Sequence, residues 1–134
     1  MGLRRKGREI AMQTLYSMEF ETEEEMNIED IAGNSNISDK KIIEFAENLL
    51  DLVQVNIESV DEKIQENSKN WSFDRIAMAD KCILRIAAAE ILFTETAHPI
   101  IINEAIEVSK KYCSESSGKF INGILHAISK GKVS

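Results

Sequence analysis

The stretch from residue 79 to residue 95, ADKCILRIAAAEILFTE, is apolar on nearly all sides when it is placed on a helix. A helix with this profile is buried over most of its surface, because it has no polar face to turn toward water. We therefore expect a central helix on which the two halves of the chain pack. Arg85 and Glu90 lie inside this stretch and must be paired or reach an edge, since an isolated buried charge is very costly. His98-Pro99 should break the helix, because proline disfavours the α conformation of the residue before it.

The spacing of apolar residues predicts helices in most of the remaining chain. Residues 3–19 fit one helix, and residues 20–38 fit a loop with one short helix near 28–33. In residues 39–68 the apolar positions recur every three or four residues, which is the spacing of a buried helical stripe. These positions are Ile42, Ala46, Leu49, Val53, Ile57, Val60 and Ile64. This stretch is either one long helix or two helices joined near Asn56, with Ser38-Asp39 as the N-cap.

Residues 102–128 predict a helical hairpin with a polar joint, SESSGK, at residues 114–119. A serine in this joint can accept a hydrogen bond from a free backbone N–H of the following helix. Gly123 lies inside that helix, where glycine costs about 1 kcal/mol relative to alanine. We expect another helix to cross close to Gly123. The predicted architecture is all-α, with about six or seven helices and no sheet.

The length of 134 residues predicts a single domain over residues 1–134. No apolar run reaches the 18 residues that suggest a membrane span, so we expect no membrane partner. The basic N-terminus has no apolar segment after it, which argues against a signal peptide. Cys82 and Cys113 are expected to be buried free thiols in a reducing, cytoplasmic setting.

The charge of the chain is unevenly distributed, although its formal net value is −7. Residues 1–18 carry four cations and one acid, whereas residues 19–68 carry fifteen acids and three lysines. Residues 69–134 have a small positive excess. A bound RNA would therefore follow the basic ends and avoid the acidic middle.

The sequence contains no recognisable motif for catalysis, metal binding or cofactor binding. Two cysteines and two histidines lack the spacing of zinc ligands. Ser117-Gly118-Lys119 resembles the end of a phosphate-binding loop, but no strand or upstream glycine precedes it. We expect neither an enzyme nor a bound cofactor.

The residues that remain suit binding to RNA. The basic arm consists of Arg4, Arg5, Lys6 and Arg8. Its cations can bind phosphates with little sequence preference. Lys119 and Phe120 place a second cation beside an aromatic ring at the start of the last helix, where an unstacked base could bind. Phe120 could equally belong to the core. Tyr16 lies on the polar face of the first helix, and the wheel alone does not decide between a surface aromatic and a contact platform.

Three segments carry a family resemblance. INEAIEVSKKY followed by SGKFINGIL, RRKGREIAMQTLYSMEF, and DKCILRIAAAEIL resemble the C-terminal, first and central helices of the NusB family of transcription antitermination factors. The resemblance spans most of the chain in the family's order. It implies the NusB-like fold, in which two helical sub-bundles share a core.

The resemblance also implies a function and a set of site residues. Such a protein binds the boxA element of nascent ribosomal RNA together with the ribosomal protein NusE. The complex then joins RNA polymerase with other Nus factors and suppresses termination. The implied RNA-binding residues are Arg4, Arg5, Lys6, Arg8, Ser116, Ser117, Lys119 and Phe120. The implied protein-partner residues are Tyr16, Asp80 and Lys81.

The chain differs from some members of the family at two positions, and two other interpretations of its function remain. Some family members carry an acid at the position of Ser116 and a bulkier residue at that of Gly118. One alternative is the NusB-like module of ribosomal RNA cytosine methyltransferases, although no methyltransferase domain follows Ser134. The other is an interaction protein whose homodimer hides the RNA surface of the basic helix.

Overall fold

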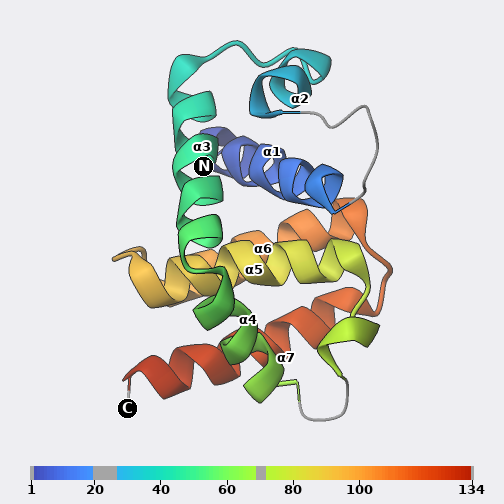
Figure 1. Ribbon diagram of the computed structural model, residues 1–134, viewed down its shortest axis with the longest axis vertical. Coiled ribbons are helices and arrows are strands. Elements are labelled where there is room, and N and C mark those ends of the chain that lie inside the picture. The colour runs from blue at the N-terminus through green and yellow to red at the C-terminus, as the bar shows by residue number, and fades with distance from the viewer. Residues whose placement is uncertain (1, 20–26, 69–71, 134) are drawn as a thin grey trace.

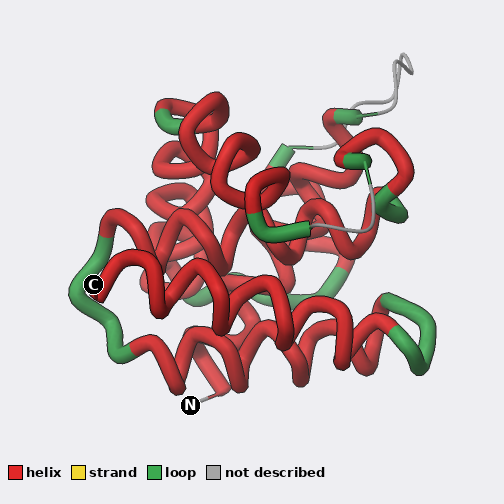
Figure 2. Tube along the Cα trace, turned by 90° about the horizontal axis from the view of Figure 1, so that it is seen from below, coloured by secondary structure: helices red, strands yellow, loops and turns green. Residues whose placement is uncertain are grey.

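The structure is a computed structural model that describes residues 2–19, 27–68 and 72–133, and these parts are helical and without strands (Figures 1 and 2). This confirms the all-α prediction. The elements are α1 (Gly2–Met18), α2 (Ile28–Asn34), α3 (Lys40–Val55), α4 (Ile57–Glu66), the 3-10 helix η1 (Phe73–Arg75), α5 (Met78–Phe93), α6 (His98–Tyr112) and α7 (Ser117–Val133). The part of the expected loop at residues 20–26 lies outside the described residues.

Helix α5 is the shared centre of two helical groups. Figure 1 shows α1, α2 and α3 in the upper half of the molecule and α4 and α7 in the lower half, with α5 and α6 crossing between them. α5 packs against α1, α3, α4, α6 and α7, and its residues 80–91 are all buried. The expected central helix is therefore confirmed, and so is the arrangement of two sub-bundles around a common core.

Local sequence accounts for several helix boundaries. The Asp39 carboxylate accepts a hydrogen bond from the backbone N–H of Lys41, as expected for the N-cap of α3. Asn56 separates α3 from α4, and its side-chain amide donates to the carbonyl of Leu52, which resolves the choice between one helix and two. Pro99 stands in the first turn of α6, where its missing N–H costs no helical hydrogen bond.

The charged residues of α5 are paired, as expected. Arg85 donates to Asp61 of α4 through Nε and Nη2, at 2.9 and 3.0 Å, and to Glu19 through Nη1 at 2.6 Å. Glu90 accepts two hydrogen bonds from Arg8 of α1. Within the described residues, no buried side-chain nitrogen or oxygen atom is left without a hydrogen-bond partner.

The prediction of a close helix crossing at Gly123 is wrong. A Cβ atom added there would meet nothing within 4 Å, and the residue is exposed. The close approach occurs at Gly7 instead, where an added Cβ would lie 2.6 Å from Cδ2 of Phe45 on α3. A helical glycine in the sequence does not reveal which side of its helix faces a neighbour. Among the described residues, no helix is long and apolar enough to cross a membrane.

Candidate nucleic-acid interface

Arg8 of the basic arm lies in the interior. It is 5% exposed, and its Nε and Nη2 atoms donate to the two carboxylate oxygens of Glu90 at 2.9 and 2.8 Å. Two parallel hydrogen bonds of this kind form the bidentate pairing of a guanidinium with a carboxylate. A phosphate could reach Arg8 only if this pair opened.

Arg5 spans the interior and the surface. Its Nε and Nη2 atoms donate to Glu104 of α6 at 2.7 and 3.1 Å, while 37% of its side chain stays exposed. Glu104 is buried, and the hydrogen bond from Arg5 lowers the pKa of the Glu104 carboxyl. Arg5 therefore fixes α1 against α6 and still presents part of its guanidinium group to solvent.

Arg4, Lys6 and Lys119 face outward. All three are exposed, and none forms an ion pair with any residue in the described ranges. The Arg4 guanidinium lies 5.6 Å from the centre of the Phe45 ring, which supports its stem without neutralising its charge. These three side chains are the cations of the predicted site that remain available to phosphate.

The basic arm belongs to α1, and α1 contacts α6, the helix that leads into the polar joint. Arg5 contacts Glu104, and Glu9 contacts Lys111 at 3.2 Å, so α1 and α6 run side by side in the same direction. The joint begins at Ser114, ten positions after Glu104, which corresponds to about 15 Å along a helix. One strand of RNA can therefore touch both the arm and the joint.

A groove of about 330 Å³ opens beside the joint. It is lined by Arg75, Ile76, Ala77, Asp80, Ser114, Ser116, Ser117 and Phe120. Phe120 is half-buried, so it packs on the core and also forms part of the groove wall. Arg75 is exposed at the end of η1, and no local pattern in the sequence indicated that this segment would meet the joint. A guanidinium group and an aromatic ring on one groove suit an unstacked base.

The three predicted partner residues differ in exposure. Tyr16 is 40% exposed on α1. Asp80 and Lys81 are buried at the start of α5, where the Lys81 ammonium lies 4.3 Å from the centre of the Phe73 ring. Asp80 accepts hydrogen bonds from the hydroxyl of Ser117, a residue of the predicted RNA surface. One predicted RNA-binding residue, Ser117, and one predicted partner residue, Asp80, therefore meet inside the molecule.

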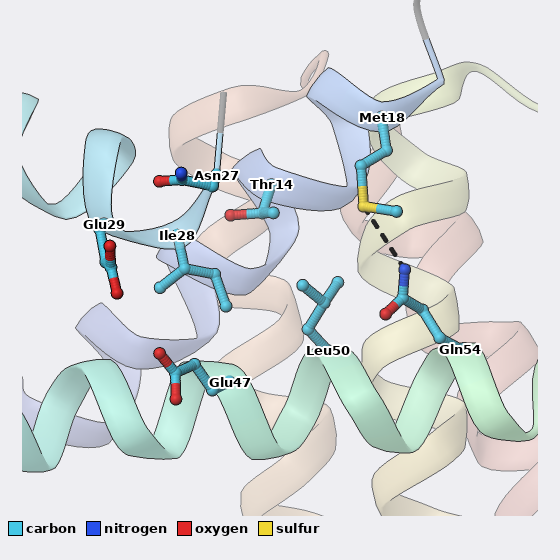
Figure 3. Close-up of a pocket in the computed structure, with 8 residues that line it drawn as sticks. All are labelled: Thr14, Met18, Asn27, Ile28, Glu29, Glu47, Leu50 and Gln54. Atoms are coloured by element: carbon cyan, nitrogen blue, oxygen red, sulfur yellow. Dashed lines mark hydrogen bonds between the residues drawn. The ribbon is translucent and has the colours of Figure 1, made fainter. Parts of the chain in front are cut away.

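A second groove, of about 450 Å³, lies between α1, α2 and α3 and is lined by two acids and no Lys or Arg. Figure 3 shows Glu29 and Glu47 at one end of it and the Met18 thioether beside Gln54 at the other. Ile28 and Leu50 line its middle. Its acids would repel phosphate, which fits the expectation that RNA follows the basic ends of the chain.

The NusB family model matches residues 5–130. This chain belongs to the NusB family. It is 39% identical over 132 residues to the transcription antitermination protein NusB of Anaeromyxobacter dehalogenans, covering 96% of this chain and 91% of that protein. It is also 39% identical over 126 residues to the NusB of Chloroherpeton thalassium, covering 92% of this chain but only 60% of that longer protein.

Solved structures of the NusB family show the same architecture. The crystal structure of the antitermination factors NusB and NusE in complex with dsRNA contains a chain that superposes with a TM-score of 0.83 and 30% identity, covering 98% of each chain. The NusB family consists of RNA-binding antitermination factors and not of enzymes. Within the described residues, no group of His, Cys, Asp or Glu side chains is placed to hold a metal ion.

Proposed function

We propose that this chain is an RNA-binding antitermination factor that binds boxA of nascent ribosomal RNA together with NusE and helps RNA polymerase to pass terminators. The observation that carries the proposal is that three cations of the predicted site, Arg4, Lys6 and Lys119, are exposed and form no ion pair within the described residues. The relatives named transcription antitermination protein NusB, and the structure of NusB and NusE with dsRNA, support it.

In this proposal each cation has a role that follows from its surroundings. Arg4, Lys6 and Lys119 bind phosphates directly, and Arg5 adds the exposed part of its guanidinium group. Arg8 acts as a positioning residue, because its fork is occupied by Glu90 and it holds α1 against α5. The RNA path then runs from the start of α1 along α6 to the joint.

The joint groove would receive a base. Phe120 offers a ring for stacking, and Arg75 offers a planar cation on the same groove. Base stacking on an aromatic ring is worth about 1–3 kcal/mol, so this contact can select single-stranded over paired RNA. Ser116 lies at the groove edge, where it can take part in a hydrogen bond with the RNA.

The protein partner would bind near Tyr16 and the start of α5. Tyr16 offers an exposed aromatic ring on α1, while Asp80 and Lys81 are buried at the start of α5. With residues 1–134 acting as one domain in the cytoplasm, RNA and NusE would occupy neighbouring surfaces. The assembled complex would then join elongating RNA polymerase.

The test is binding of a short boxA RNA and of a scrambled RNA, each with and without NusE and at two salt concentrations. We expect a preference for boxA, tighter binding when NusE is present, and a loss of affinity at higher salt. Equal binding of the two RNAs, unaffected by NusE, would contradict the proposal.

A further inference from the structure

Four oxygen-bearing side chains form a continuous series from the surface of the joint to the interior. The Ser116 hydroxyl lies 3.2 Å from that of Ser114, which lies 3.0 Å from that of Ser117. The Ser117 hydroxyl donates to both carboxylate oxygens of Asp80, at 2.9 and 3.0 Å. Ser116 and Ser114 are exposed, whereas Ser117 and Asp80 are buried.

Counting hydrogens fixes the direction of this series. A serine hydroxyl has one hydrogen to donate, and an ionised carboxylate can only accept. Because Ser117 donates its hydrogen to Asp80, its bond with Ser114 must use the hydrogen of Ser114. That leaves Ser116 as the donor in its bond with Ser114. Each hydroxyl therefore points inward, toward Asp80.

The position of Asp80 favours its ionised form, which sets the direction of these hydrogen bonds. It lies in the first turn of α5, where the helix dipole favours a negative charge. Burial and then a hydrogen bond to Asp80 raise the pKa of the Cys113 thiol to about 12, so this thiol stays protonated near neutral pH. Asp80 thus interacts with Ser117 of the joint and with Cys113, the residue just before the joint.

We propose that Asp80 orients the serines of the joint so that Ser116 presents a hydrogen-bond acceptor, and that this oxygen recognises a hydrogen-bond donor of the RNA. The proposal rests on the proposed function. The donor is a ribose 2′-hydroxyl or an exocyclic amino group, and it cannot be a phosphate, because phosphate oxygens only accept. Ser117 does not touch RNA and acts as a positioning residue, since it is 4% exposed and its hydrogen is already used.

With Ser116 as an acceptor, the joint groove would favour RNA groups that donate a hydrogen bond. Ser116, Ser114 and Phe120 line the same groove, so a base stacked on Phe120 would bring its sugar or its amino group near the Ser116 oxygen. Arg75 then supplies donors to phosphate, while Ser116 supplies the acceptor. Recognition of a 2′-hydroxyl would also let the joint distinguish RNA from DNA.

The experiment measures binding of boxA RNAs that each carry one altered group, in the wild type and in Ser116→Ala. One series replaces a single 2′-hydroxyl by hydrogen or fluorine, neither of which can donate. A second series replaces guanosine by inosine or adenosine by purine riboside, which removes an amino group. A third series replaces one phosphate by a neutral methylphosphonate. Ser116→Thr, which keeps the hydroxyl, is the matched control, and thermal unfolding checks the fold.

We expect one position in the first or second series to lower wild-type affinity about 3-fold to 10-fold, as for the loss of a neutral hydrogen bond. The same change should have no effect in Ser116→Ala and its usual effect in Ser116→Thr. In Ser117→Ala the effect should shrink, because Ser114 and Ser116 are no longer oriented.

Two results would overturn the inference while leaving the proposed function intact. One is an equal effect of every altered group in the wild type and in Ser116→Ala. The other is coupling of Ser116 to a methylphosphonate, which would show that Ser116 donates to phosphate. Failure of the wild type to prefer unmodified boxA RNA over scrambled RNA would overturn both proposals.

Discussion

The two halves of the basic arm carry the same charge but differ in what surrounds them. Arg5 pairs with the buried carboxylate of Glu104 on α6, and Arg8 pairs with that of Glu90 on α5. Arg4 and Lys6, in the same two turns of α1, stay exposed and pair with no described carboxylate. A cluster of cations in a sequence can therefore contain both the residues that build a binding surface and those that use it.

The largest expected effect is at the buried half of the arm. Arg8→Ala leaves Glu90 buried and uncompensated, which should lower the free energy of unfolding by about 3–5 kcal/mol. Chemical denaturation measures this directly. The matched control replaces both partners by apolar residues, Arg8→Met with Glu90→Leu, and should recover most of the loss. A cost below about 1 kcal/mol for Arg8→Ala would show that the pair does not hold α1 in place.

A second prediction concerns the packing of the same face of α1. Gly7→Ala would place a Cβ 2.6 Å from the Phe45 ring, and relieving that overlap should cost about 1–3 kcal/mol. Gly123→Ala is the control, because the space around it is open and alanine favours the helix by about 1 kcal/mol. Thermal unfolding should therefore shift down for one variant and up for the other. Equal shifts would contradict the close approach of α1 and α3 at Gly7.

The Arg5 contact predicts a dependence on pH. The pKa of Glu104 is lowered in the folded protein, mainly by its hydrogen bond from Arg5. The resulting stability is present above the unfolded pKa of a glutamate, about 4.3, and is lost as the pH falls through the lower folded pKa. The difference in unfolding free energy between the wild type and Arg5→Ala should therefore shrink on acidification. Arg4→Ala is the control, and its difference should not change with pH.

Much of the fold could be predicted from the sequence, because local patterns determine it. The apolar profile of residues 79–95 predicted the central helix, the stripe from Ile42 to Ile64 predicted α3 and α4, and Asp39 was the expected N-cap. The prediction that Arg85 and Glu90 must each have a partner is also confirmed. Each of these depends on residues within one helix or on the general cost of a buried charge.

The details of the site depend on contacts between distant residues, which the sequence does not show. Arg8 and Glu90 are 82 positions apart, so the pattern of residues 3–19 did not reveal the partner of Arg8. Arg75 of η1 lines the same groove as Ser116 and Phe120, although about 40 positions separate it from them in the sequence. The link between Asp80 and Ser117 likewise joins two helices, and it connects residues that the family resemblance assigned to different partners.

The most direct test of the contrast within the basic arm is the salt dependence of RNA binding by a variant in which Arg4, Lys6 and Lys119 are all replaced by alanine. Each phosphate contact with single-stranded nucleic acid makes the slope of log affinity against log salt more negative by about 0.7. Loss of three contacts should therefore make the slope shallower by about 2. The unfolding free energy should change by no more than about 0.5 kcal/mol for each exposed residue. An unchanged slope in a folded variant would contradict the assignment of these outward cations to phosphate.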